Sequence, residues 1–99
     1  MSDKSELIWH KEAINDLEHL SEFLKPKNPK VAFNAARKII AASNLLLEQP
    51  YLGHPIEEMP EFLKLTIPFG KNGYVMKYRI DNGSIIILRV KHTREDRDF

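Results

Sequence analysis

The chain has 99 residues, of which 42% are hydrophobic and 29% charged, and it contains no cysteine. This length supports one domain with one modest core, and the lack of cysteine excludes disulfides, thiolate metal sites and a cysteine nucleophile. No apolar run approaches the ~18 residues of a membrane span, and the polar, acidic start is not a signal peptide, so we expect a cytoplasmic protein. The net charge of +1 hides an asymmetry, because residues 71–99 carry seven Lys and Arg against four Asp and Glu. This mildly basic third permits an anionic partner.

The first half of the chain predicts a short strand followed by two helices. Residues 6–10 are apolar and aromatic, which is typical of a strand. From Lys11 the apolar residues recur every three or four positions, which predicts an amphipathic helix of about 14 residues that ends before Pro26. Asn28 is a good N-cap and is followed by a proline, so a second helix is expected from there to Glu48. The short connection between them predicts an antiparallel hairpin.

The second half predicts a loop and three strands. Residues 50–61 contain three prolines and a glycine and are expected to form a loop. Alternation of apolar and polar residues predicts strands over 63–67, 74–80 and 84–91. The predicted fold is therefore α+β with the order β-α-α-β-β-β, in which the helical hairpin packs on one face of a mainly antiparallel four-stranded sheet.

The register of the last hairpin decides which side chains reach the core. A two-residue turn at 82–83 would pair Ile80 with Ile85, whereas a three-residue loop at 81–83 would pair Ile80 with Ser84. The second register is preferred because it gives one continuous apolar face under the helices. The expected strand residues of that core are Tyr74, Met76, Tyr78, Leu88 and Val90, and the expected helix residues are Leu17, Leu20, Leu24, Val31, Ile39 and Leu46.

In this register the uncovered face of the sheet is basic. Such a face can hold phosphates or an acidic peptide, although charged residues also simply solvate the open face of a sheet. The cations expected there are Lys77, Arg79, Arg89 and Lys91, with Lys64 nearby and the apolar Ile85 and Ile87 among them.

The polar C-terminal segment is the second candidate site. His92 could act as a general acid or base near neutral pH, and Arg94 could stabilise developing negative charge. The alternative role for His92 is structural, as a hydrogen-bonding cap at the end of the sheet. The other histidines lack metal-ligand spacing, and no nucleophile-elbow or P-loop pattern is present, so we expect no metal and no cofactor.

These patterns together resemble the RelE/ParE superfamily, the toxins of type II toxin–antitoxin systems. The resemblance covers nearly the whole chain. It is carried by Leu46, Pro50 and Gly53 after the second helix, by Tyr74, Tyr78 and Arg79 in one strand, and by the Arg-Val-Lys-His strand end at 89–92.

The superfamily resemblance implies an antitoxin partner, a toxin–antitoxin hetero-oligomer and one of two targets. RelE-like members cleave messenger RNA in the ribosome, and in that branch His92 and Arg94 would be catalytic. ParE-like members poison DNA gyrase without being enzymes, and the sequence around His92, Arg94 and Glu95 is more similar to that branch. A relative that has lost toxicity and only binds is a third possibility. The arginine often found in the family's second strand is Leu63 or Lys64 here, which weakens a phosphate-binding role for that strand.

The favoured expectation is a ParE-like plasmid-stabilisation toxin. Its predicted target-binding residues are Lys77, Arg79, Arg89, Lys91, Arg94, Arg97 and Phe99. Its predicted antitoxin contacts are Ile85 and Ile87, because that register leaves them exposed on the uncovered face.

Overall fold

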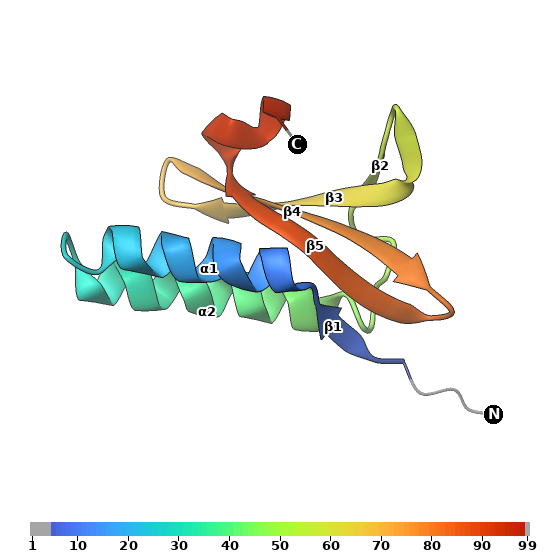
Figure 1. Ribbon diagram of the computed structural model, residues 1–99, viewed down its shortest axis with the longest axis horizontal. Coiled ribbons are helices and arrows are strands. Elements are labelled where there is room, and N and C mark those ends of the chain that lie inside the picture. The colour runs from blue at the N-terminus through green and yellow to red at the C-terminus, as the bar shows by residue number, and fades with distance from the viewer. Residues whose placement is uncertain (1–4, 99) are drawn as a thin grey trace.

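The computed structural model describes residues 5–98, with side chains up to Glu95, as two helices packed on one face of a five-stranded sheet (Figure 1). The sheet order is β1-β5-β4-β3-β2, in which β1 runs parallel to β5 and all other neighbours are antiparallel. The elements are β1 (Leu7–Trp9), α1 (Lys11–Leu24), α2 (Pro29–Leu45), β2 (His54–Ile56), β3 (Met59–Phe69), β4 (Asn72–Asp81), β5 (Ser84–His92) and the 3-10 helix η1 (Thr93–Asp98).

The predicted α+β class and the predicted helical hairpin are confirmed, with one strand more than expected. The additional strand β2 lies inside the proline-rich segment that was expected to be a loop. It is only three residues long and sits at the sheet edge, where a proline such as Pro55 costs no ladder hydrogen bond on its outer side. No helix among the described residues is both long and apolar enough to cross a bilayer.

Both helices begin with a side-chain cap. The His10 Nδ1 atom accepts a hydrogen bond from the Glu12 backbone N–H at 3.1 Å. The Asn28 Oδ1 atom accepts from the N–H groups of Lys30 and Val31, as its N-cap position predicts. Helix α2 ends three residues before the expected Glu48, because a tight turn of backbone hydrogen bonds follows Leu45.

The hairpin between β4 and β5 has the two-residue turn, so the preferred three-residue loop was wrong. Asn82 and Gly83 have φ values of 52° and 86°, as a type I′ turn requires. Ile80 therefore pairs with Ile85. A β-bulge then adds one residue to β5, because Tyr78 pairs with Ile87 while the preceding Lys77 pairs with Arg89.

The two-residue turn overturns the predicted exposure of Ile85 and Ile87. Pairing with Ile80 and Tyr78 places both isoleucines on the helix-covered face, where each is fully buried. After the extra residue, Val90 returns to the same face opposite Met76, and Leu88 is only half-buried. Ile85 and Ile87 are thus core residues and do not offer a surface to an antitoxin.

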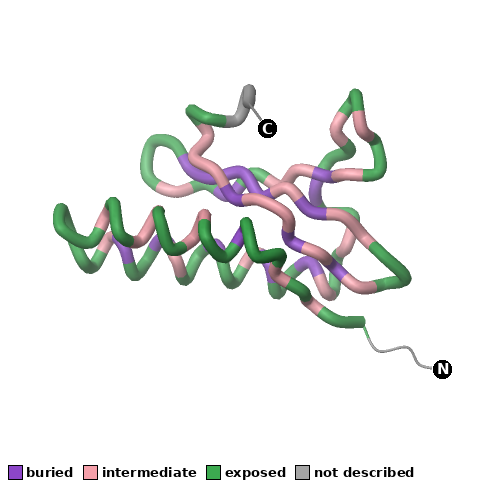
Figure 2. The backbone as a smooth tube through the Cα atoms, in the orientation of Figure 1, coloured by how far each residue is buried: buried purple, intermediate pink, exposed green. Residues whose placement is uncertain are grey.

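The core lies between the sheet and the helices (Figure 2). Most of the predicted core is confirmed, whereas Val31 is half-buried and Leu17, Leu20 and Leu24 pack against its margin. The buried cluster consists of Ala13, Ala35, Ile39, Leu46, Leu63, Ile67, Tyr74, Met76, Tyr78, Ile85, Ile87 and Val90.

The loop after α2 is fastened to the core by Tyr78. The phenol donates a hydrogen bond to the Pro50 carbonyl at 2.7 Å and accepts one from the Gly53 N–H at 2.9 Å. A Cβ on Gly53 would lie 2.6 Å from the Lys64 carbonyl oxygen and 2.8 Å from the Tyr78 hydroxyl, so only glycine fits. This contact gives a physical reason for the Leu46, Pro50 and Gly53 spacing seen in the sequence.

Candidate functional site

A cleft of about 690 Å³ lies between α1, the end of β5 and η1, and it contains both His92 and Arg94. Its apolar surface comes from Leu20, Phe23, Leu24, Tyr74 and Val90. Its polar surface carries both signs of charge and comes from Asp16, His19, Arg89, Lys91, His92, Arg94 and Glu95. The C-terminal polar segment and the first helix therefore share one surface.

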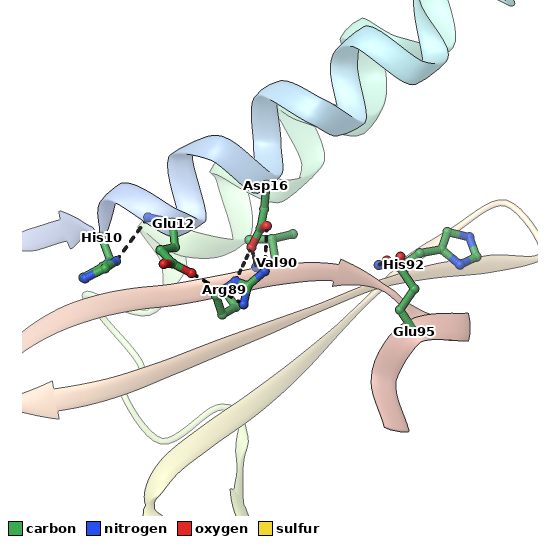
Figure 3. Close-up of polar contacts among 7 residues, drawn as sticks. All are labelled: His10, Glu12, Asp16, Arg89, Val90, His92 and Glu95. Carbon is green, nitrogen blue, oxygen red and sulfur yellow. Dashed lines mark hydrogen bonds and ion pairs between the residues drawn. The ribbon is translucent and has the colours of Figure 1, made fainter. Parts of the chain in front are cut away.

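Arg89 is held by helix α1. Its guanidinium forms a bidentate salt bridge with the Asp16 carboxylate, with distances of 2.8 Å from Nε and 3.1 Å from Nη2 (Figure 3). The Arg89 Nη1 atom also lies 3.7 Å from a carboxylate oxygen of Glu12. The hydrogen bond to Asp16 is the main cause that raises the pKa of Arg89 above its usual value. Although Arg89 pairs with Lys77 in the sheet, its charge is neutralised at the helix instead of projecting alone from the open face.

Asp16 also satisfies the edge of the sheet. Strand β1 pairs with β5 only as far as Ile87, and among the described residues no strand neighbours the rest of β5 on that side. There the Val90 N–H donates to Asp16 Oδ2 at 2.9 Å, and the His92 N–H donates to Glu95 Oε1 at 3.2 Å. Two carboxylates thus accept hydrogen bonds from backbone N–H groups that would otherwise lie unpaired at the strand edge.

His92 is fixed at the junction of β5 and η1. Its Nδ1 atom accepts a hydrogen bond from the Arg94 N–H at 3.2 Å, and its ring meets Tyr74 edge-on at a centroid distance of 5.6 Å. Burial raises the pKa of Tyr74, so this phenol stays neutral at physiological pH. The hydrogen bonds around His92 are those of the structural cap, and its Nε2 atom remains the ring atom through which proton transfer to a ligand would have to run.

Of the predicted basic residues, Arg89, Lys91 and Arg94 line the cleft with His92, whereas Arg79 lies apart from them. Lys64, Lys77 and Arg89 are register neighbours across β3, β4 and β5. Arg79 lies further along β4, where its guanidinium is 3.7 Å from Asp81. His92 pairs with Tyr74, five residues from Arg79 and therefore roughly 16 Å away along the strand.

The remaining predicted residues lie beside the cleft or outside the described part. Lys91 and Arg94 line the cleft. The side chain of Arg97 and the whole of Phe99 fall outside the described residues. Among the residues that are described, no three His, Asp or Glu side chains lie close enough together to hold a metal ion.

Sequence reasoning missed Asp16 and Phe23. Asp16 belongs to the polar side of an amphipathic helix. Its hydrogen bond to the β5 backbone is possible because β1 ends at Trp9, and no sequence pattern predicts that end. Phe23 is an aromatic residue on the helix with 64% of its surface exposed, and the Lys27 ammonium lies 3.9 Å from its ring centroid. The aromatic-cation pair at i and i+4 was the available signal.

Comparison with known proteins identifies the family. The family model of the ParE toxin of type II toxin–antitoxin systems, parDE, matches residues 7–97. Toxin RelE1 of Caulobacter vibrioides is 31% identical over 85 residues, which cover 86% of this chain and 89% of that protein. Toxin RelE3 of the same organism is 29% identical over 86% of this chain and 90% of its own length.

Solved structures share the fold. The chromosomal ParDE system from P. aeruginosa matches with a TM-score of 0.74 and 23% identity, over 89% of this chain and 95% of that one. The intact E. coli RelBE toxin–antitoxin complex matches with a TM-score of 0.57 and 16% identity over the same shares. With a family model that spans almost the whole sequence and a curated relative above 30% identity, the chain belongs to the RelE/ParE superfamily of type II toxin–antitoxin toxins.

Proposed function

We propose that this toxin is ParE-like: it inhibits DNA gyrase by binding and is not itself a ribonuclease. A cognate antitoxin neutralises it in the cytoplasm, in a hetero-oligomer of the kind that the similar ParDE and RelBE structures represent. The match of the ParE toxin family model to residues 7–97 supports the gyrase branch.

The observation that carries the proposal is that two of the cations a ribonuclease would need, Arg89 and Arg79, lie against carboxylates, and that Arg79 lies away from the cleft that contains His92. Cleavage of an RNA phosphate requires cations and an acid–base group around one scissile bond. Here the Arg89 guanidinium is bound by Asp16. Arg79 lies beside Asp81 at one end of β4, whereas His92 of β5 pairs with Tyr74 near the opposite end of β4. Such an arrangement favours a binding protein over a catalyst.

The cleft beside α1 supplies the proposed gyrase contact. Interfaces depend on aromatic and arginine anchors more than on other residue types. Phe23 and Arg94 provide these at the cleft, where Lys91 adds a positive charge, and Lys77 and Arg79 add cations along β4. Arg97 and Phe99 remain predicted contacts.

A ribosome-dependent ribonuclease is the second candidate, because both curated relatives carry RelE names. In that case His92 transfers the proton and Arg94, two residues away, stabilises the phosphate charge. Loss of the imidazole would then slow the chemical step by about 10²–10⁴-fold.

Purified gyrase with supercoiled plasmid tests the proposal. We expect the toxin to accumulate gyrase–DNA cleavage complexes and His92→Ala to do the same, while ribosome-bound message stays intact. Phe23→Ser should weaken the effect, and Phe33→Ser is its matched control, since Phe33 is 62% exposed, also carries a neighbouring cation and lies outside the cleft. Message cleavage that is lost in His92→Ala would replace the gyrase mechanism by the ribonuclease.

A further inference from the structure

We propose that the outer face of the helical hairpin, the side of α1 and α2 that points away from the sheet, binds a second copy of this chain. The proposed dimer is symmetric, and α1 of each copy lies against α2 of the other. The inference goes beyond the proposed action on gyrase and does not depend on it. The residues assigned to this face are Ile14, Glu18, Glu22, Lys30, Phe33, Arg37 and Ile40, and none of them lines the cleft beside α1.

Three large apolar side chains are exposed on the outer face. Ile14 of α1 is 44% exposed, and Phe33 and Ile40 of α2 are 62% and 43% exposed. Phe33 and Ile40 are seven residues apart, so they share one side of α2, and the fully buried Ala35 lies on the opposite side. Exposed apolar residues that gather on one face of a small protein mark a site of association.

The two helices carry opposite charges. Helix α1 contains one lysine and four carboxylates, whereas α2 contains three cations and no Asp or Glu. Glu18 lies four residues after Ile14, and Arg37 lies four residues after Phe33, so exposed charges flank the apolar residues on both helices. The outer face is therefore acidic along one side and basic along the other.

These charges are not neutralised within the hairpin. Helix α1 ends at Leu24 and α2 begins at Pro29, so Glu22 and Lys30 are about equally far from the turn. Nevertheless, no ion pair joins the described residues of α1 to those of α2. Both signs of charge are thus available to a partner.

A two-fold axis parallel to the helices satisfies both sides of the face at once. Such an axis keeps each residue at its own level along the hairpin and exchanges the two sides, which makes the contact self-complementary. Glu22 then faces the partner's Lys30, and Ile14 faces the partner's Ile40. A nucleic acid or an acidic peptide would match α2 but would be repelled by α1, so a second copy is the occupant that fits the whole face.

An exchange of charges tests the dimer. Glu22→Lys and Lys30→Glu each place like charges against each other in a symmetric dimer, and mixing the two variants restores opposite charges at both contacts. The matched controls are Glu57→Lys and Lys71→Glu, which reverse exposed charges in the turns on either side of β3. Sedimentation velocity of each purified full-length protein at micromolar concentrations measures self-association, and circular dichroism verifies the fold.

We expect the wild-type protein and both controls to reach a species of twice the mass of one chain. Glu22→Lys and Lys30→Glu alone should each raise the dimer dissociation constant by about tenfold or more, and their mixture should recover the dimer. Ile40→Ser should weaken the dimer as well, whereas Leu52→Ser, which removes a similarly exposed side chain from the loop after α2, should not.

A wild-type protein that stays monomeric would overturn the proposal, and so would a mixture of the two charge variants that recovers no dimer. Weaker antitoxin binding by the variants with unchanged self-association would overturn it too, because the antitoxin would then occupy the face. Failure of the gyrase proposal is recognised separately, since one copy contains the complete cleft. It would appear as a dimer that forms normally but accumulates no gyrase–DNA cleavage complexes.

Discussion

At the scale of single residues, Asp16 connects helix α1 to strand β5, bonding to residues that lie 73 and 74 positions further along the chain. It pairs with the Arg89 side chain and accepts a hydrogen bond from the Val90 N–H. Asp16→Ala would leave both donors without this partner, so we expect the free energy of unfolding to fall by about 1–3 kcal/mol in urea denaturation. Glu12→Ala is the control. Glu12 is mostly exposed and 3.7 Å from Arg89, and its loss should cost less than about 0.5 kcal/mol.

Tyr78 is the residue on which the loop after α2 depends. Tyr78→Phe removes the donor to the Pro50 carbonyl and the acceptor for the Gly53 N–H while keeping the ring. We expect it to lower the free energy of unfolding by about 1–3 kcal/mol, measured by urea denaturation. Tyr51→Phe removes a hydroxyl from a side chain that is 77% exposed and should have no measurable effect. Similar values for the two variants would show that the buried phenol does not anchor the loop.

The buried tyrosines also predict how stability depends on pH. Burial raises the pKa values of Tyr74 and Tyr78 above 10 in the folded protein, while the unfolded chain has the ordinary value. Their contribution is therefore fully present below about pH 10 and is lost as the pH rises through the folded pKa values. Unfolding measured from pH 8 to 11 should show stability falling above pH 10, and less steeply in Tyr74→Phe. A flat profile would contradict this prediction.

At the scale of elements, α2 shows which of two adjacent isoleucines faces the sheet. Ile39 is fully buried and Ile40 is 43% exposed. Ile39→Ala should leave a cavity and lower the free energy of unfolding by about 2–5 kcal/mol, whereas Ile40→Ala should cost less than about 1 kcal/mol. Thermal and urea denaturation of the two variants measures the difference. A larger loss for Ile40→Ala would mean that the helix is rotated from the described position.

The helices were predictable because their apolar periodicity is local, as is the Asn28 cap of α2, although the His10 cap of α1 was not foreseen. Asn28 and the apolar stripe through Ile39 identify α2 without reference to any other element. Strand β5 was also predicted, but its register was not, because residues 85–88 are apolar on both faces and fit either register. The buried set Ile85, Ile87 and Val90 changes spacing from two to three, which is the signature of the bulge, but the turn must be known before this spacing can be interpreted.

The candidate site was predictable in composition but not in arrangement. His92, Lys91 and Arg94 do line a cleft. Arg89 was expected on an open basic face, and its neutralisation by Asp16 depends on how far β1 extends along β5. Such a contact joins distant segments, and no local pattern encodes it.

At the scale of the whole molecule, the cleft and the outer face of the hairpin are separate surfaces. The cleft is formed by α1, β5 and η1, whereas the outer face belongs to α1 and α2. We expect deletion of residues 93–99 to remove toxicity, since it removes Arg94 and the predicted contacts Arg97 and Phe99, while self-association through the hairpin persists. Growth assays and sedimentation velocity measure the two effects. Retained toxicity after the deletion would show that the target does not use this end of the chain.

Pulse-labelling after induction distinguishes the proposed action on gyrase from action on the ribosome. Incorporation of labelled thymidine should fall before incorporation of labelled methionine, and His92→Ala should produce the same order of events. If methionine incorporation falls first with the wild-type protein and continues normally with a folded His92→Ala protein, the toxin is a ribonuclease and does not act through gyrase.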